Sequence, residues 1–200
     1  MLTGLPGCGK SHVSEMLTDV VGRTPICLDE LREERFPLAR LGREVKYATE
    51  TTGFLYRLVH ARARSQLETG RSAILDGTFL VSGGRAETAD VALEIGGEVL
   101  FIKVTAPEGV ILERLARRQV GADHKSDAGI EVYRMMAGRI ASGESGYSDP
   151  ELDRRQGSCP GELVVVDTHA RTVRVTALTR LSLAVAHGLA ALGFSLQGPA

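Results

Sequence analysis

The chain has 200 residues, of which 43% are hydrophobic and 24% are charged, the size and balance of one globular domain spanning residues 1–200. The formal net charge of −1 excludes a general basic surface, so we expect neither nucleic acid nor an anionic membrane as a partner. The three cysteines share no metal-like spacing and no apolar run reaches 18 residues, so we expect a reducing, cytoplasmic location.

The first motif of the chain is a glycine-rich segment at residues 4–11. It reads Gly-Leu-Pro-Gly-Cys-Gly-Lys-Ser, and its glycines let backbone N–H groups point inward around a polyphosphate. A helix expected from Ser11 to about Val21 directs the positive end of its dipole at the same anion. A glycine-rich turn before a helix is the alternative. The predicted nucleotide-binding residues are Gly4, Leu5, Pro6, Gly7, Cys8, Gly9, Lys10, Ser11 and the adjacent His12.

Within this pattern, the lysine and the serine have distinct roles. Lys10 reaches the β- and γ-phosphates, and the Ser11 hydroxyl is placed to bind Mg²⁺. Only residues 1–3 precede the loop, whereas a typical strand has about 5 to 6 residues. Either this strand is only a stub or the natural chain begins further upstream. We expect the second, with a truncated first strand whose missing part an upstream domain or a partner supplies.

Two short apolar runs are each followed by an aspartate. Residues 24–28 precede Asp29 and residues 72–75 precede Asp76, and both runs predict buried parallel strands. Ligands of open α/β sheets bind at the carboxyl ends of the strands. Phosphoryl transfer needs one carboxylate for the metal and another for the proton of the acceptor. We assign Asp76 to Mg²⁺ and Asp29 to the proton, although the sequence also allows the reverse, and Asp29 can cap a helix as well.

The region between and after these strands is expected to be helical. A short helix after Asp29 places Arg32 on the same side, and a long helix is expected at residues 43–68, with a possible interruption near residues 51–53. Arg85 opens a further helix, where it contacts a phosphate or lies on the surface.

A fourth strand is expected at residues 98–105, followed by a helix that carries two arginines on one face. Arg114 and Arg118 are four residues apart, a spacing that can clamp a transferring phosphoryl group. An ordinary charged helix surface is the alternative. The polar stretch at about 119–128 predicts a small lid that closes over the nucleotide.

The last third of the chain completes a parallel five-stranded sheet. A helix is expected at 128–141, a loop at 142–162, a fifth strand at 163–166 and a helix at 176–192. Asp167 and Thr168 follow that strand, where the loop can form the floor of an adenine site. The fold class predicted is a three-layer α/β fold with helices on both faces of the sheet.

These residues together resemble the small P-loop kinases related to polynucleotide 5′-kinase, chloramphenicol phosphotransferase and zeta-toxin-like proteins, often labelled AAA family ATPases. The sequence is also similar to the module that follows an aminoglycoside-phosphotransferase-like domain in bacterial proteins. The resemblance rests on the loop at 4–11, Asp29-x-x-Arg32, Gly-Arg-Ser-Ala-Ile-Leu-Asp-Gly-Thr-Phe-Leu at 70–80 with Arg85 beyond it, and Glu-Arg-Leu-Ala-Arg-Arg at 113–118 followed by Ser-Asp-Ala at 126–128.

The resemblance implies a P-loop NTPase fold and ATP-dependent phosphorylation of a hydroxyl group, with ATP and Mg²⁺ as cofactors. It implies that Asp29 is the general base and that Arg32 contacts the acceptor. Arg114 and Arg118 belong to the lid side, Arg114 with the nucleotide and Arg118 with the catalytic residues.

Two further positions can be compared with the family. Asp76-Gly77-Thr78 stands where the family has Asp-Ala-Thr, which places Thr78, like Arg85, among the substrate-binding candidates. His12 stands where a threonine usually follows the Lys-Ser pair, so a hydroxyl that can contact the α-phosphate is absent while the backbone N–H is kept.

The function expected is transfer of the γ-phosphate of ATP to a hydroxyl of a small molecule. A polynucleotide 5′-hydroxyl acceptor is an alternative, which the near-neutral charge and the lack of a basic tract with interleaved aromatics weaken. A regulatory ATPase that binds nucleotide without a small-molecule product is a second alternative. No motif identifies the acceptor.

Overall fold

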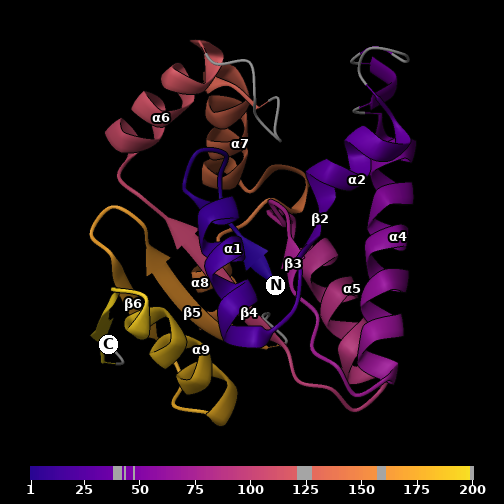
Figure 1. Cartoon of the computed structure of the whole chain (residues 1–200). Helices are drawn as coiled ribbons and strands as arrows, with labels where there is room; N and C mark the ends of the chain where they lie inside the picture. Colours follow the sequence, from indigo (N-terminus) through magenta and orange to yellow (C-terminus); the bar gives the residue numbers. More distant parts are fainter. Residues whose placement is uncertain (38–41, 43, 47, 121–127, 157–160, 199–200) are drawn as a thin grey trace.

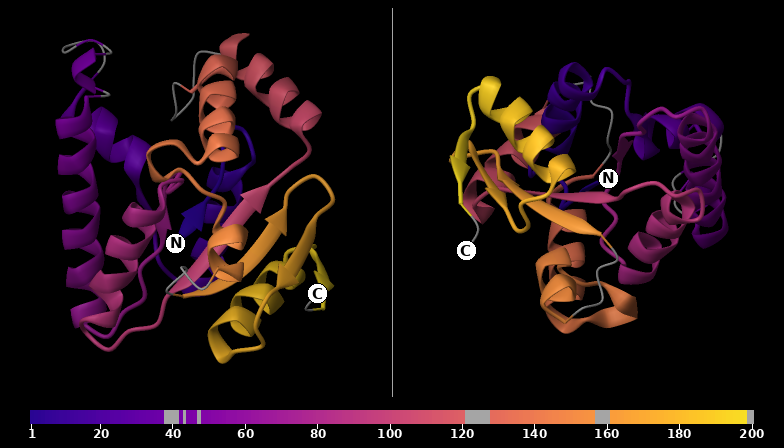
Figure 2. Two further views of the ribbon diagram at one scale, coloured as in Figure 1. Left: turned by 180° about the vertical axis from the view of Figure 1, so that it is seen from behind. Right: turned by 90° about the horizontal axis from the view of Figure 1, so that it is seen from below.

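The structure is a computed structural model in which a sheet of mostly parallel strands lies between two layers of helices (Figure 1, Figure 2). None of the helices described is long and apolar enough to cross a bilayer. The residues described are 1–37, 42, 44–46, 48–120, 128–156 and 161–198.

The larger sheet has the strand order β1-β4-β5-β6-β7. Strands β1, β4 and β5 are parallel, whereas β6 is antiparallel to β5 and parallel to β7. The strand bounds are Leu2–Thr3 (β1), Leu100–Thr105 (β4), Glu162–Asp167 (β5), Thr172–Val175 (β6) and Ser195–Gln197 (β7).

A second parallel pair, β2 (Ile26–Cys27) and β3 (Leu75–Asp76), lies beside β1 (Figure 1). Gly4 N donates to Thr78 O at 3.1 Å, so the glycine-rich loop is joined to the turn after β3. Strands β1 to β5 are the five expected from the sequence, and the mostly parallel α/β fold is confirmed. The antiparallel β6 and the short β7 were not expected.

Apolar side chains on both faces of the strands hold the layers together. On one face, Leu2 and Val164 pack with α1 and α9, and on the other, Phe101 and Leu163 pack with Ala89 of α5. The helix bounds are Lys10–Val21 (α1), Leu28–Arg35 (α2), Thr49–Glu68 (α4), Ser82–Leu93 (α5), Glu108–Val120 (α6), Ile130–Ser142 (α7), Pro150–Arg155 (α8) and Arg180–Ala191 (α9).

Two expectations about helices and loops were wrong, and a third concerns residues outside the described ranges. The loop expected at 142–162 contains a 3₁₀ turn at Glu144–Gly146 and helix α8, which begins because Asp149 caps it and proline follows. Helix α4 runs through residues 51–53 without the expected interruption. The central part of the expected lid, residues 121–127, lies outside the described residues.

Candidate active site

The glycine-rich segment forms a loop between β1 and α1. Gly4 has φ of +148°, and a Cβ there would lie 2.4 Å from the carbonyl oxygen of Val104. Gly9, just before α1, has φ of +100°, and a Cβ there would lie 2.9 Å from the side chain of Thr168. Both positions require glycine because the loop passes against the carboxyl ends of β4 and β5. The free N–H groups at the start of α1 then make the loop suitable for an anion.

The Lys10 side chain is hydrogen-bonded to carbonyl groups of the glycine-rich loop. Its Nζ donates to Gly4 O at 2.9 Å and to Leu5 O at 3.0 Å. Ser11 and His12 follow in the first turn of α1 with exposed side chains. A phosphate bound in this loop would compete with the two carbonyl oxygens for the same ammonium group.

Two carboxylates lie at the carboxyl ends of the paired strands β2 and β3. Cys27 at the end of β2 is in register with Asp76 at the end of β3, and Asp29 follows in the first turn of α2. Burial raises the pKa of Asp76, the positive charge of Lys10 and the nearby Ser14 hydroxyl oppose this, and the charge of Asp29 adds to it. Asp76 therefore interacts electrostatically with both the loop lysine and Asp29.

Asp29 forms an ion pair with Arg32 within α2. Arg32 Nη1 donates to Asp29 Oδ1 at 2.6 Å, and the exposed fractions of the side chains are 9% for the arginine and 38% for the aspartate. The buried guanidinium fixes one carboxylate oxygen because the two residues are three apart in the helix. The exposed part of the Asp29 carboxylate can meet an acceptor from solvent.

The turn after β3 is tied to β1 through its backbone. Thr3 Oγ1 donates to Thr78 O at 2.8 Å and to Phe79 O at 3.1 Å. Phe79 has φ of +42°, a left-handed conformation that is uncommon for a residue with a side chain. Thr78, a predicted substrate-binding residue, thus lies beside the loop, with its carbonyl group bound to Thr3 and Gly4.

Arg114 of α6 contacts the back of the glycine-rich loop. Its Nη1 donates to Thr168 Oγ1 at 2.8 Å and to the carbonyl oxygens of Gly7 and Cys8 at 3.4 Å. Thr168 Oγ1 in turn donates to Cys8 O at 2.7 Å. The arginine and the threonine therefore join α6, the end of β5 and the loop into one unit.

Arg118 lies one helical turn beyond Arg114 and is partly exposed. Its neighbour Arg117 pairs with Glu113 at 2.6 Å, whereas no carboxylate among residues with described positions pairs with Arg118.

The Arg85 side chain is buried and bonds to other parts of the protein. Only 2% exposed, it donates to Phe79 O at 2.6 Å and to Ser148 Oγ at 2.6 Å, and it pairs with Asp153 of α8. This arrangement favours a structural role, in which Arg85 holds the turn after β3, over the substrate contact expected from the sequence.

The donor set near the loop fits a magnesium ion. Ser11 offers a hydroxyl and Asp76 a carboxylate, the oxygen ligands that Mg²⁺ prefers together with water and phosphate. No group of three or more His, Cys, Asp or Glu side chains suited to a metal occurs in the described part of the chain. A cation bound mainly by nucleotide and water requires no such group.

The family model described as the AAA domain matches residues 1–142. The chain belongs to this AAA domain family. An uncharacterized Mycobacterium tuberculosis protein is 26% identical to it over 153 residues, which are 74% of this chain and 30% of that protein. A UPF0200 protein of Aeropyrum pernix is 36% identical over 126 residues, 59% of this chain and 63% of that protein. This AAA domain chain thus spans about 30% of the length of the mycobacterial relatives.

Solved structures share the fold of this AAA domain chain. Chaetomium thermophilum Kti12 in complex with ADP-AlF₃ has a TM-score of 0.62 at 14% identity and covers 96% of this chain and 95% of its own. A gluconokinase from Sinorhizobium meliloti has a TM-score of 0.54 at 18% identity and covers 96% and 90%. The expected likeness to small P-loop kinases is confirmed at the level of family and fold.

Some residues of this site were not identified from the sequence. Thr3 binds the turn after β3 and lies at the end of an expected strand, a position that could have singled it out. Thr168 is expected from the sequence only as part of the floor of an adenine site, and its hydroxyl group binds the glycine-rich loop. Ser148 and Asp153, the partners of Arg85, carried no such signal because they lie in a segment expected to be a loop.

Proposed function

We propose that the chain is an ATP-dependent phosphotransferase that moves the γ-phosphate of ATP to a hydroxyl group of a small molecule. The observation that carries the proposal is the placement of Asp29 and Asp76 at the ends of two paired strands, with Asp76 in electrostatic contact with both Asp29 and Lys10. A site that only binds nucleotide needs a loop and a metal carboxylate. A second carboxylate, ion-paired and half-exposed, suits transfer to an acceptor.

In this proposal the loop and its lysine bind the nucleotide. Lys10 exchanges its contacts with Gly4 O and Leu5 O for oxygens of the β- and γ-phosphates. Ser11 and Asp76 would hold Mg²⁺, which supplies positive charge to the phosphate oxygens when bound. Burial of Asp76 strengthens its attraction for a cation because the carboxylate has little competing water.

Asp29 would receive the proton of the acceptor. As the hydroxyl oxygen bonds to the γ-phosphorus, its proton passes to the Asp29 carboxylate, and the bond from that phosphorus to the bridging oxygen breaks to release ADP. Arg32 orients the carboxylate through their 2.6 Å contact. Arg114 and Arg118 would add positive charge from the side of α6.

The proposal is tested by incubating the protein with γ-labelled ATP and fractionated metabolites, with 5′-hydroxyl oligonucleotides as a separate acceptor pool. We expect label in a small molecule, and a loss of transfer of roughly 100-fold or more in Asp29→Asn with ATP affinity little changed. Asp19→Asn is the matched control, because Asp19 is an exposed aspartate on α1. Transfer that survives in Asp29→Asn would contradict the proposal.

Two other outcomes separate the alternatives. Label found only on oligonucleotides would identify a polynucleotide kinase. Tight ATP binding with no labelled acceptor, and turnover that does not depend on Asp29, would identify a regulatory ATPase.

A further inference from the structure

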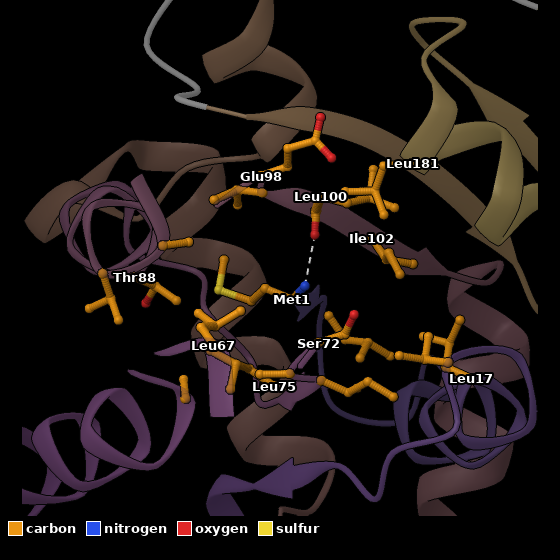
Figure 3. A pocket seen from close by; sticks show the side chains of 18 of the residues that line it. Met1, Leu17, Leu67, Ser72, Leu75, Thr88, Glu98, Leu100, Ile102 and Leu181 are labelled. Carbon is orange, nitrogen blue, oxygen red and sulfur yellow. Dashed lines mark hydrogen bonds between the residues drawn. The ribbon is translucent and has the colours of Figure 1, made fainter. Parts of the chain in front are cut away.

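The buried face of α1 carries a polar side chain in an otherwise apolar setting. The buried residues of this helix are Val13, Ser14 and Leu17. Val13 and Leu17 belong to the apolar core, and Leu17 lines an apolar cavity together with Ile102 (Figure 3). Ser14 is only 2% exposed. Alanine is smaller and favours a helix, so the packing of α1 does not by itself explain a hydroxyl group here.

The Ser14 hydroxyl has no hydrogen-bond partner among the residues that the structure describes. A serine or threonine inside a helix often bonds to the carbonyl group four residues earlier, and Thr18 donates in this way to Ser14 O at 3.4 Å. Ser14 makes no such bond to Lys10 O. A buried hydroxyl without a partner costs free energy, so we looked for an acceptor that it can reach.

The carboxylate of Asp76 is the acceptor that the position of Ser14 indicates. Ser14 lies four residues after Lys10, so the two side chains share one face of α1. This helix packs against β3, which ends at Asp76. Burial raises the pKa of Asp76, and both Lys10 and the Ser14 hydroxyl lower it, so both groups are close to the carboxylate. Asp76 is 7% exposed, so little water competes with Ser14 for its oxygens.

We propose that Ser14 is a positioning residue for Mg²⁺, whose hydroxyl donates to one oxygen of Asp76 and so directs the other oxygen at the metal. The inference rests on the metal site of the proposed function, in which Ser11 and Asp76 hold the cation. Ser11 and Ser14 are three residues apart, so a single turn of α1 supplies a ligand of the metal and a donor to the other ligand. Hydrogen bonds to a ligating carboxylate orient it and strengthen metal binding.

A purely structural role for the hydroxyl leads to a different expectation. If the hydroxyl joined α1 to β3, its removal would lower the stability of the protein without nucleotide. In the proposal it makes no such contribution, because it has no partner of ordinary geometry in the described chain and because alanine is the better helix former. Stability and metal dependence therefore separate the two roles.

The test measures ATP affinity by calorimetric titration, once with Mg²⁺ and once with EDTA, and unfolding midpoints without nucleotide. We expect Ser14→Ala to reduce the factor by which Mg²⁺ raises ATP affinity roughly 10-fold. Its ATP affinity in EDTA should equal that of the wild type, and its midpoint should be equal or higher. Thr18→Ala is the matched control, because it removes a hydroxyl one turn further along α1, and it should leave the effect of Mg²⁺ unchanged.

A second variant retains the size of the side chain. Ser14→Cys keeps a weak donor, so its Mg²⁺ effect should lie between those of the wild type and Ser14→Ala. An unchanged Mg²⁺ effect in Ser14→Ala, a lower midpoint in that variant, or an equal loss in Thr18→Ala would overturn the proposal. These measurements do not depend on phosphate transfer. A protein that shows the Ser14 effect but labels no acceptor would support this inference and contradict the proposed function.

Discussion

The ring of Phe79 occupies the space beside Gly77 where a side chain would begin. A Cβ at Gly77 would lie 2.9 Å from the ring atom Cε2 of Phe79, closer than such atoms approach. Phe79 is itself held in a left-handed conformation, with its carbonyl oxygen bound by Thr3 and Arg85. Gly77 is thereby matched to the phenylalanine two residues later.

Gly77→Ala should destabilise the protein by roughly 1–3 kcal/mol, because the ring has to move from a well-packed position. The matched control is Gly83→Ala in α5, where a Cβ meets nothing within 4 Å and where alanine favours the helix. Denaturant unfolding measures both variants. Phe79→Leu should reduce the penalty of Gly77→Ala, and equal stability of Gly77→Ala and the wild type would show that the ring does not hold this position.

Asp76→Asn should make the protein more stable and should weaken the effect of Mg²⁺ on ATP binding. The pKa of Asp76 is raised by burial above its ordinary 3.8, so the folded state holds this proton more tightly and stability falls as the pH rises above 3.8. The asparagine variant should therefore be more stable at pH 7, with a flatter pH dependence. The Mg²⁺-dependent part of its ATP affinity should fall roughly 10- to 100-fold. Calorimetric titration with and without Mg²⁺ measures this part, and an unchanged Mg²⁺ effect would remove Asp76 from the metal site.

Lys10→Ala should weaken ATP binding roughly 10- to 100-fold, because it removes a charge-assisted contact with the phosphates. The unfolding midpoint without nucleotide should change little, since the Lys10 ammonium bonds only to the loop itself among the residues described. Titration of a fluorescent ATP analogue measures the affinity. An affinity close to that of the wild type would mean that nucleotide does not bind in this loop.

Arg85→Met should destabilise the protein by roughly 3–5 kcal/mol, because it leaves the buried Asp153 carboxylate without its partner. The double variant Arg85→Met/Asp153→Leu should recover most of that loss. Arg64→Met serves as the control, because the ion pair of Arg64 with Glu94 is exposed and contributes about 1 kcal/mol or less. Similar denaturant midpoints for the Arg85 and Arg64 variants would contradict a structural role for the buried pair.

The stability of the chain should rise with pH between about 5 and 8, because the buried Met1 amine has a pKa of about 5 in the folded protein and an ordinary value of 8.0. The unfolded chain binds more protons in this window, so acid favours unfolding. The difference between pH 8 and pH 6 should be on the order of 2–3 kcal/mol. Comparison with an N-acetylated protein isolates this group from Asp76, and identical pH profiles of the two forms would contradict the prediction.

The elements with strong local signals were predictable from the sequence. The loop at 4–11 has a pattern set by phosphate binding, and the apolar runs before Asp29 and Asp76 indicate strands whose carboxyl ends meet at one edge. That edge is where the structure places both aspartates. Parallel strands require this arrangement, so it follows once the strands are recognised.

The parts that were missed depend on contacts between distant residues. Helix α8 has six residues, too few for an apolar period to appear. The burial of Arg85 depends on Asp153, 68 positions away, and nothing near Arg85 in the sequence distinguishes a buried arginine from an exposed one. The antiparallel β6 pairs with β5 across a short turn, and its alternation was too brief to separate from a loop.

The hydrogen bonds between Lys10 and its loop limit the binding free energy that a ligand can gain from this lysine. Its ammonium group already has two carbonyl acceptors, so a ligand gains from this lysine only the difference between a phosphate and two peptide oxygens. A nucleoside monophosphate has no β- or γ-oxygen to offer and gains little, whereas a triphosphate gains the full exchange. In the proposed site we therefore expect the loop to favour a triphosphate over a monophosphate, because Lys10 has to give up its contacts with Gly4 O and Leu5 O.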